Sequence, residues 1–507
     1  MGESLFGRHR ICAVIAAPTA KEMARQLRRA LRFTRTVELR LDYLRSNLER
    51  GYFLGWLDLQ RPRATMIATC RVREAGGRFT GDLAAQSVFL AVAAAVGCRW
   101  CDIEIETAAR FGTSKHWKRF LNLARVVLSC HDFRGTPGNL GAIVRRLERW
   151  GGDAIKIATQ CNSIADSLRV LALARRKRRV VAVPMGEMGL PARVLALREG
   201  SALAYGAAGE ATAPGQLTLE EMRNLYRADK VDRRTRVYGV IGNPVGHSLS
   251  PLLHNSGFQA RRMNAVYLPF LVRDVRDFLA AIAPLGIAGF SVTLPHKQRI
   301  LNYLHDCDPL ARRIGAVNTV VVRGGGKLYG YNTDYVGVLR ALEQRVRLRG
   351  SRVLIYGAGG AARAVAFALA QGGAIVCVSA RRLEKARALA RAVGGEVAQS
   401  ARLRREFFDA IVNATPVGMH PLAAESPLEP AELNCRVVMD LIYRPMKTRL
   451  LELAERRGIE TISGVQMFLA QGTAQWEIWT GMRAPEAAMR RAVLAALRRE
   501  EVLEGKP

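Results

Sequence analysis

Short apolar segments alternate with longer amphipathic stretches through the first 230 residues of the chain. This pattern indicates buried β-strands separated by surface α-helices, because a buried strand is apolar throughout and a surface helix on one face only. The predicted strands begin at Ile11, Val37, Ala64, Trp100, Arg125, Asp153, Arg179 and Ala202. Eight such strands predict a (β/α)8 barrel. A closing helix over 217–227 and a polar linker over 228–236 follow, so the first domain is predicted to span 1–230.

The second half is also α/β but has a different rhythm. A new strand from Val237 opens a compact α/β domain over 236–350, in which Gly324-Gly325-Gly326 predicts a hairpin turn. From Arg352 a strand runs into a glycine-rich turn and a helix, which is how a nucleotide-binding βαβ unit begins, and this domain is predicted to cover 351–467. Residues 468–503 are strongly helical, and we expect them to pack back on an earlier domain and complete it.

Length and composition limit the kind of protein. The 507 residues exceed what one hydrophobic core usually serves, and 49% hydrophobic with 24% charged residues is an ordinary globular composition. The longest uncharged run, 364–380, contains Gln371-Gly372-Gly373 and predicts helix, turn and strand instead of a membrane span. Nine scattered cysteines indicate reduced thiols, and the first strand begins too early for a targeting peptide, so a cytoplasmic location is expected.

The net charge of +33 is spread over both halves of the chain, and only 11 of the 77 basic residues are lysine. Such a field attracts anionic metabolites, and nucleic acid without sequence preference. The densest cluster, over 175–179, is interpreted as the end of a solvated helix. We therefore expect small-molecule substrates as partners, with no specific nucleic acid and no membrane.

Because lysine is scarce, a lysine inside a predicted strand is informative. In the segment Ile155-Lys156-Ile157, period-2 alternation sends both isoleucines toward the helices and Lys156 to the barrel interior. A desolvated amine there has a lowered pKa and can attack a carbonyl to form a Schiff base. The competing interpretation is a lysine at the strand end whose amine reaches solvent.

Charged residues recur on the interior faces of two other predicted strands. Glu38, Arg40 and Asp42 share one face of VELRLD, and the same spacing recurs in CDIEIE at Asp102, Glu104 and Glu106. Three charges on one face are costly in a core unless they pair or line a site. His131 follows another strand at the rim where barrel enzymes place catalytic groups, which makes it a candidate acid or base, although a lone histidine there is more often structural.

Five motifs give the first half a resemblance to the Schiff-base (type I) 3-dehydroquinate dehydratases: VELRLD, TCR followed by a glycine pair, SCHDF, DAIKIA and TAPGQ. The resemblance implies that Lys156 forms an imine with the ring ketone of the substrate, and that His131 removes the neighbouring proton and helps to expel water. Glu38 and Arg40 would bind ring hydroxyls, Arg71 and Arg193 polar and carboxylate groups, and Thr212 and Gln216 would close the site.

The first half departs from that family at two positions. Thr212 stands where a serine is usual, which keeps a hydroxyl. Ala75 stands where a glutamate usually precedes the glycine pair, and the adjacent Glu74 is expected to point elsewhere. The catalytic pair is unaffected, but the ordering of substrate at this loop is in question.

In the second half, a glycine turn after the strand RVLI opens a helix, where small residues let the backbone approach a pyrophosphate. The next strand ends in Arg381-Arg382, where an NAD enzyme usually offers an acidic residue, so a 2′-phosphate and NADP are favoured. Two ordinary surface arginines are the alternative. Upstream turns supply Lys297 and Asp334, a pair that can hold and relay the proton of a secondary alcohol during hydride transfer.

Eight motifs give this half a resemblance to the shikimate dehydrogenases: GNPVGHSLSP, GFSVTLPHK, AVNT, GYNTD, GAGGAARA, NATPVGM, DLIYRP and SGVQMFLAQG. Ser291 in GFSVT replaces the asparagine of single-domain members and resembles the plant fused enzymes. The resemblance implies Lys297 and Asp334 as the catalytic pair and Ser248 and Ser250 as ligands of the substrate carboxylate. Thr293, Asn318, Tyr443 and Gln471 would contact hydroxyls or orient the ring. Gly357, Ala358, Gly359, Gly360, Ala361, Arg381, Thr415, Leu441 and Gly464 would line the NADP site.

Together these resemblances predict a TIM barrel, a shikimate-dehydrogenase-like substrate domain and a Rossmann NADP-binding domain in one two-step enzyme. It would dehydrate 3-dehydroquinate to 3-dehydroshikimate and then reduce that ketone to shikimate with NADPH. Two alternatives stay open: a second half that prefers quinate, and a degenerate chain kept as a scaffold or non-specific nucleic-acid binder. No metal is expected, because the lone Cys98-to-Cys101 pair has no second pair of ligands.

Overall fold

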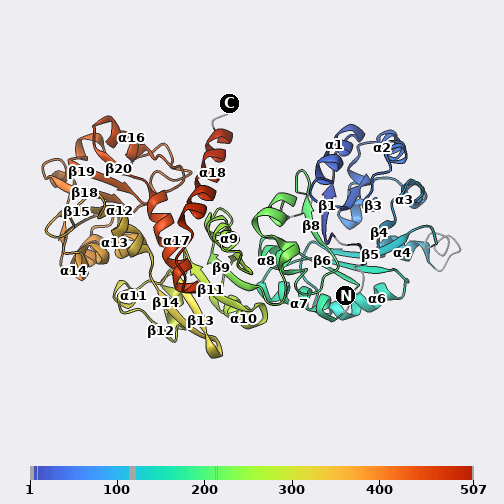
Figure 1. The fold of residues 1–507 in the computed structure, drawn as a ribbon, viewed down its shortest axis with the longest axis horizontal. Helices are drawn as coiled ribbons and strands as arrows, with labels where there is room; N and C mark the ends of the chain where they lie inside the picture. The colour runs from blue at the N-terminus through green and yellow to red at the C-terminus, as the bar shows by residue number, and fades with distance from the viewer. Residues whose placement is uncertain are drawn as a thin grey trace. The chain divides into compact units, whose positions relative to one another are not determined.

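The computed structural model describes residues 5–7, 9–112, 122–176, 179–211, 213 and 215–504. Its internal contacts divide the chain into two compact units. The first unit comprises Met1–Arg236 together with Asn264–Gly286, and the second comprises Val237–Met263 together with Ile287–Pro507. Each unit is built from strands and helices in alternation (Figure 1).

An eight-stranded sheet forms the centre of the first unit, with the strands in the order β7-β6-β5-β4-β3-β2-β1-β8. Every recorded pair in it is parallel. The N–H of Ala202, just before β8, donates to the carbonyl of Val180 at 2.9 Å, which brings the two ends of the sheet together. The predicted barrel is therefore confirmed as nearly closed. Its strands are β1 (Ile11–Ile15), β2 (Thr36–Arg40), β3 (Thr65–Thr69), β4 (Trp100–Glu104), β5 (Arg125–Asp132), β6 (Ala154–Gln160), β7 (Val180–Met185) and β8 (Ala204–Ala207).

Helices connect these strands, and four of them begin at a side-chain cap. Thr19, Ser46, Asp82 and Asn139 each accept a hydrogen bond from the backbone N–H three residues further on. Such caps mark where each amphipathic stretch of the sequence becomes helical. The helices are α1 (Ala20–Ala30), α2 (Asn47–Gln60), α3 (Leu83–Ala95), α4 (Ile105–Phe111), α6 (Leu140–Glu148), α7 (Ile164–Arg176) and α8 (Leu190–Leu195).

The helix predicted over 217–227 is shorter than expected. Thr218 is drawn into an extended bridge with Ala207, and the carboxylate of Glu221 accepts from the backbone and hydroxyl of Thr218. The helical geometry ends in a π-helical turn at Glu221–Leu225. Pairing with β8 thus replaces the first turn of the predicted helix.

A mixed sheet follows, with the strand order β10-β9-β11-β13-β14-β12. Strands β13 and β14 are antiparallel and are joined through Gly324–Gly326, which confirms the predicted hairpin turn. The strands are β9 (Arg236–Gly242), β10 (Ala265–Leu271), β11 (Ile287–Val292), β12 (Asp306–Cys307), β13 (Thr319–Arg323) and β14 (Lys327–Tyr331). The helices of this region are α9 (Ser250–Ala260), α10 (Val275–Leu285), α11 (Pro309–Ile314) and α12 (Asp334–Leu342).

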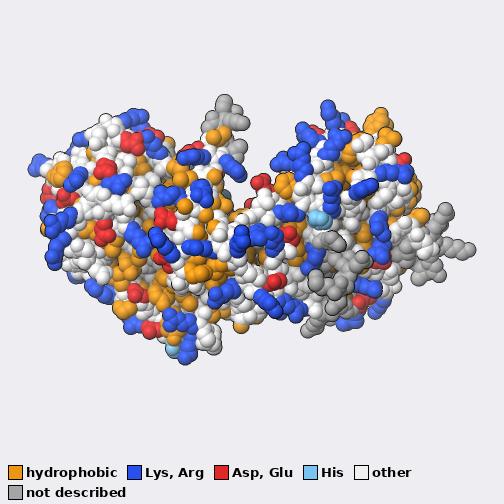
Figure 2. Space-filling model, in the orientation of Figure 1, with side chains coloured by type: hydrophobic (Ala, Val, Ile, Leu, Met, Phe, Trp, Pro, Cys, Tyr) orange, Lys and Arg blue, Asp and Glu red, His pale blue; other side chains and the backbone are white. Residues whose placement is uncertain are grey.

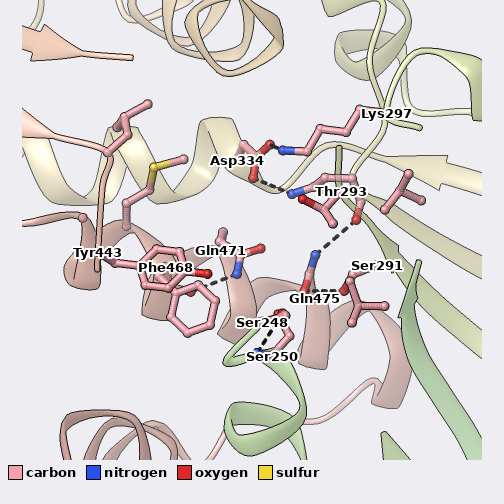
Figure 3. Close-up of a pocket in the computed structure, with 16 residues that line it drawn as sticks. Ser248, Ser250, Ser291, Thr293, Lys297, Asp334, Tyr443, Phe468, Gln471 and Gln475 are labelled. Atoms are coloured by element: carbon pink, nitrogen blue, oxygen red, sulfur yellow. Dashed lines mark hydrogen bonds and ion pairs between the residues drawn. The ribbon is translucent and has the colours of Figure 1, made fainter. Parts of the chain in front are cut away.

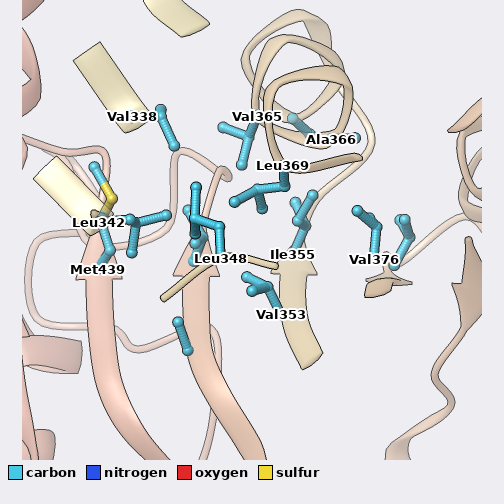
Figure 4. Packing of buried hydrophobic residues seen from close by; sticks show 14 of the residues in the cluster. Val338, Leu342, Leu348, Val353, Ile355, Val365, Ala366, Leu369, Val376 and Met439 are labelled. Carbon is cyan, nitrogen blue, oxygen red and sulfur yellow. The ribbon is translucent and has the colours of Figure 1, made fainter. Parts of the chain in front are cut away.

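The third sheet is parallel, in the order β17-β16-β15-β18-β19-β20. Val353 and Ile355 of β15 pack against Val365 and Leu369 of α13 in a dry core beneath the glycine turn (Figure 4). The strands are β15 (Arg352–Tyr356), β16 (Ile375–Ser379), β17 (Glu396–Val397), β18 (Phe408–Asn413), β19 (Cys435–Asp440) and β20 (Glu460–Ile462). The helices are α13 (Gly360–Gln371), α14 (Leu383–Val393), α15 (Ser400–Leu403) and α16 (Arg449–Arg456). This is the predicted Rossmann-like arrangement.

The C-terminal segment, predicted to be strongly helical, forms two helices. Helix α17 (Gly464–Thr480) ends at Gly481, and α18 (Glu486–Glu504) begins after Pro485. Helix α17 packs on α12, and α18 packs on α9 (Figure 1). The break lets the two helices cover different parts of the second unit.

Candidate active sites

The interior of the barrel holds Lys156, whose side chain on β6 is 4% exposed. Its Nζ donates to Glu38 Oε1 and to Asp102 Oδ2, each at 3.0 Å, and lies 4.3 Å from the ring centroid of Tyr205. The amine is therefore inside the barrel and does not reach solvent.

Both carboxylates are themselves held in place. Glu38 Oε1 accepts from the hydroxyl of Thr69 at 2.9 Å, and Asp102 Oδ1 accepts from Ser129 at 2.6 Å and from Arg71 at 3.2 Å. Burial acts to raise the pKa of Asp102, but Lys156, Arg71 and His131 outweigh it and lower that pKa. Asp102 is thus an anion that fixes Lys156 and Arg71 together.

The other charged residues of this face behave differently from one another. Arg40 forms a two-pronged ion pair with Asp42 at 2.9 and 2.8 Å, and both are buried. Burial raises the pKa of Glu104 to about 7, while its Oε2 accepts from Gln86 and Thr107. The prediction for Glu106 is wrong: β4 ends at Glu104, the chain turns into α4, and Glu106 is exposed.

His131 lies near the end of β5, beside β6 in the sheet. Burial, followed by the charges of Arg71 and Lys156, lowers its pKa well below the ordinary value. The imidazole is therefore neutral at neutral pH and able to accept a proton. Its Nδ1 is buried and makes no hydrogen bond to the described residues, while the ring of Phe133 stacks on it at 6.2 Å.

The loop after β3 explains what the Ala75 departure does. Ala75 is buried in a 3-10 turn, and Glu74 beside it is exposed. Gly76 has φ +79°, and a Cβ there would lie 2.2 Å from the ring of Phe133. The loop thus packs its glycine against the ring that covers His131 and brings no carboxylate inward at Ala75.

Two further residues predicted for the first site lie in segments that follow β7 and β8. Arg193 of α8 is 5% exposed, donates to the carbonyl of Pro184 in β7 at 2.7 Å, and has its pKa lowered to about 10 by burial. Gln216 is half-buried in the segment that follows β8. Thr212 lies outside the described residues.

The second unit contains a pocket that collects most of the residues predicted for it (Figure 3). Lys297 and Asp334 face each other on one side, and Ser248 and Ser250 lie across the pocket from them (Figure 3). The lining comprises Val240, Ser248, Ser250, Ser291, Val292, Thr293, Lys297, Asn318, Asp334, Leu441, Tyr443, Gly464, Met467, Phe468, Gln471 and Gln475.

On its side of the pocket, Lys297 Nζ donates to Asp334 Oδ2 at 2.7 Å. Asn318 Nδ2 donates to the other oxygen, Oδ1, at 2.7 Å, so each carboxylate oxygen has a partner. Asp334 opens α12, where the helix dipole favours a negative charge. Such a pair can hold a substrate oxygen and pass a proton to it.

The other predicted substrate residues line the rest of the pocket. The N–H of Ser250 donates to Ser248 Oγ at 3.2 Å, where α9 begins. The ring of Tyr443 stacks on Phe468 at 4.7 Å, and Gln471 Nε2 donates to the carbonyl of Phe468 at 2.9 Å. Polar groups therefore face the pocket from opposite sides, as a polyhydroxylated ring requires.

Gln475 and Ser291 are buried members of this lining to which the motifs assign no role. Ser291 Oγ donates to Gln475 Oε1 at 2.9 Å. Gln475 lies four residues after Gln471 on α17, so helical periodicity alone places both on one face. The four-residue spacing between Gln471 and Gln475 is the sequence feature that could have identified Gln475 as part of the pocket.

The glycine turn after β15 is shaped for a dinucleotide. Gly357 has φ +128°, and a Cβ there would lie 2.9 Å from the carbonyl oxygen of Ala414. Gly359 and Gly360 face open space, and α13 starts at Gly360, so a pyrophosphate has both room and the positive end of a helix. Ala358 and Ala361 complete this turn.

Further predicted cofactor residues lie along the same edge of the sheet. Arg381 follows β16 and is exposed, and Thr415 after β18 donates its N–H and hydroxyl to Asn413 Oδ1. Leu441 and Gly464 belong to the pocket that contains Lys297. A dinucleotide in the glycine turn would therefore meet the substrate pocket at Leu441 and Gly464.

The described ranges offer few features of other kinds of site. No group of three or more His, Cys, Asp or Glu side chains suited to a metal ion was found there. Cys98 and Cys101 are buried free thiols whose pKa is raised by burial, to about 12 for Cys98.

Among the helices described, none is long and apolar enough to cross a membrane. Lys and Arg side chains are scattered over the visible surface and form no single patch (Figure 2).

Three family models match the chain. Residues 11–233 match type I 3-dehydroquinase, residues 240–320 the shikimate dehydrogenase substrate binding domain, and residues 464–494 the shikimate 5'-dehydrogenase C-terminal domain. A solved shikimate dehydrogenase in complex with NADP+ is 39% identical with a TM-score of 0.50, covering 53% of this chain and 97% of its own.

Curated relatives match either the second half alone or both halves together. A shikimate dehydrogenase (NADP(+)) of Thermococcus kodakarensis is 43% identical over 52% of this chain and 98% of its own length. The bifunctional 3-dehydroquinate dehydratase/shikimate dehydrogenase, chloroplastic, of Arabidopsis thaliana is 35% identical over 94% of this chain and 83% of its own length. With a likeness that spans both units, the chain belongs to the bifunctional 3-dehydroquinate dehydratase/shikimate dehydrogenase family, a lyase and an NADP-dependent oxidoreductase of the shikimate pathway.

Proposed function

We propose that Lys156 and His131 carry the dehydration of 3-dehydroquinate. Lys156, once it has lost a proton, attacks the ring ketone and releases water to form an imine. The protonated imine withdraws electrons, so neutral His131 can take a proton from the neighbouring carbon. The hydroxyl on the next carbon then leaves as water, with His131 returning its proton. Hydrolysis of the imine releases 3-dehydroshikimate and restores the amine.

The other barrel residues are proposed to bind and orient the substrate. Glu38 and Arg40 take ring hydroxyls, and Arg71 and Arg193 take polar and carboxylate groups, since each is a buried charge at or near the end of the barrel that holds Lys156. Gln216 and Thr212 close the site. Asp102 is added to the set predicted from the sequence, because it holds Lys156 and Arg71 together.

One observation carries this proposal: the only lysine in the eight barrel strands lies within 3.0 Å of two carboxylates in the interior. Treatment with borohydride in the presence of 3-dehydroquinate should reduce the imine and leave a stable adduct on Lys156. Mass spectrometry of the digested protein locates the adduct. An adduct elsewhere, or none, would remove the Schiff-base assignment.

For the second activity we propose that Lys297 and Asp334 act on the ketone of 3-dehydroshikimate. Lys297 donates a proton to the substrate oxygen as the carbon is reduced, and Asp334 holds Lys297 in place through its 2.7 Å contact. Ser248 and Ser250 bind the substrate carboxylate, while Thr293, Asn318, Tyr443 and Gln471 contact hydroxyls or orient the ring. NADPH, when bound, supplies the hydride.

The residues proposed to hold NADPH are those of the glycine turn and its neighbours: Gly357, Ala358, Gly359, Gly360, Ala361, Arg381, Thr415, Leu441 and Gly464. The preference for NADPH over NADH is assigned to Arg381, whose exposed guanidinium follows β16, where a ribose 2′-phosphate would lie.

The division of labour is proposed to follow three domains: the barrel over 1–230, a substrate domain over 236–350 completed by 468–503, and the NADP domain over 351–467. The partners are proposed to be small-molecule substrates, with no metal, no specific nucleic acid and no membrane. Nine free cysteines support a reducing compartment, for which the cytoplasm is proposed.

A further inference from the structure

Gln475 is 2% exposed on α17, and its carboxamide has four contacts. Its Oε1 accepts from Ser291 Oγ at 2.9 Å and lies 3.3 Å from His254 Nε2. Its Nε2 donates to Thr319 Oγ1 at 3.0 Å and to the carbonyl of Asn318 at 3.3 Å. All the donors and acceptors of this amide are therefore used by the protein, and none is left for a substrate.

The orientation of this amide follows from its partners. The carbonyl of Asn318 can only accept, so the nitrogen of the Gln475 amide must face it, and the oxygen must face Ser291 and His254. Burial lowers the pKa of His254 to about 3, so its imidazole is neutral. Nε2 then carries the hydrogen that the oxygen of Gln475 accepts.

From Gln475 a directed series of hydrogen bonds reaches the catalytic pair. The hydroxyl of Thr319 has one proton, and because it accepts from Gln475 it directs that proton to Asn318 Oδ1 at 2.7 Å. Asn318 Nδ2 in turn faces Asp334 Oδ1 at 2.7 Å, and Asp334 Oδ2 accepts from Lys297. Every link has one direction, and each partner in it is buried or half-buried.

We propose that Gln475 is a positioning residue for the reduction step: aligned by His254 and Ser291, its carboxamide orients Thr319 and Asn318, and through them the carboxylate that holds Lys297. This inference rests on the catalytic assignment of Lys297 and Asp334. It predicts that Gln475 acts on the rate of the chemical step and not on the binding of NADPH, because the four contacts of its amide are with Ser291, His254, Thr319 and Asn318 and not with the glycine turn.

The experiment is a double-variant cycle in the full chain, with Gln475→Met and Thr319→Val. Methionine keeps the length of the side chain but removes both ends of the amide. Each single variant should lower kcat for reduction roughly ten- to hundredfold while KM for NADPH stays within about twofold. The double variant should have a kcat no lower than that of the more impaired single variant, because both substitutions break the same series of hydrogen bonds.

Thr473→Ala is the matched control, since Thr473 is buried on the same helix but its hydroxyl is bonded only to the carbonyl of Ala470. It should retain kcat. The inference is overturned if Gln475→Met keeps wild-type kcat, if the losses of the two variants simply multiply, or if kcat falls only in proportion to the folded protein seen by thermal unfolding. Failure of the underlying assignment is seen separately, as undiminished reduction by Lys297→Ala.

Discussion

In the barrel, single residues acquire their chemistry from partners far along the chain. Lys156 contacts Glu38 and Asp102, which are 118 and 54 residues away in sequence. These carboxylates hold the amine at one point of the interior, while His131 is kept neutral by burial and by two neighbouring cations. Lys156 and a neutral histidine are thus held in the same barrel.

His131→Ala should separate the two steps assigned to the barrel. Without the base, dehydration should slow by roughly 10²- to 10⁴-fold, but the imine can still form because Lys156 is unchanged. Borohydride with 3-dehydroquinate should therefore still label Lys156 in this variant, as seen by mass spectrometry. Near wild-type turnover would show that another group takes the proton.

Glu104 makes stability depend on pH. Burial raises its pKa from an ordinary value near 4.5 to about 7, although Arg71 opposes this. The folded state thus binds more protons than the unfolded state between these values, so its stability falls as pH rises through that window. The free energy of unfolding of Glu104→Gln, measured relative to that of wild type, should therefore increase by on the order of 3 kcal/mol from pH 5 to pH 8.

Urea unfolding of the full chain at both pH values, followed by circular dichroism, measures this gain. The control is Glu106→Gln, which changes the same residue type two positions later on an exposed surface. Its effect on stability should be the same at pH 5 and pH 8. An equally flat response from Glu104→Gln would contradict the assignment.

Among the elements, loops at the strand ends decide how the barrel site is covered. The loop after β3 can pass beneath Phe133 only because Gly76 has no side chain and a left-handed φ. The ring of Phe133 lies on His131 in turn. A change in this loop should therefore act on the histidine without touching it directly.

Gly76→Ala should lower kcat/KM for dehydration by about tenfold or more, because the new methyl group forces both the backbone and Phe133 to move. Reduction by the same sample should be unchanged, since Lys297 lies in the other unit. Gly324→Ala is the control, because a Cβ at Gly324 meets nothing within 4 Å. Equal activity of the two variants would mean that the loop tolerates the displacement.

At the level of the whole molecule, each activity is contained in one compact unit. The contacts of Lys156 lie within the first unit, and those of Lys297 within the second. The product of the first reaction is the substrate of the second, so an intermediate released by one molecule can be used by another. We therefore expect each site to work when the other is inactive.

Lys156→Ala should therefore lose dehydration and keep reduction, and Lys297→Ala should do the reverse. A mixture of the two variants should form shikimate from 3-dehydroquinate and NADPH, whereas neither should do so alone. Consumption of NADPH at 340 nm with chromatography of the products follows both steps. No shikimate from the mixture would indicate that the activities depend on each other within one chain.

Local patterns in the sequence were sufficient for the order of the strands, the interior position of Lys156 and the glycine turn, because periodicity and motif spacing act over a few residues. The motifs also predicted Lys297 and Asp334 as a pair, and the structure places them in contact at 2.7 Å. The exposure of Glu106 and the shortened helix before 228 depended on where each element packs.

Only the tertiary structure decided which carboxylates hold Lys156, that His131 is kept neutral, and that Gln475 is bonded to Ser291 and Thr319. These contacts join residues more than fifty positions apart, and several of them owe their chemistry to burial. Burial and long-range contacts are properties of the folded chain, because they depend on which surfaces pack against each other and exclude water. A local periodicity in the sequence does not contain that information.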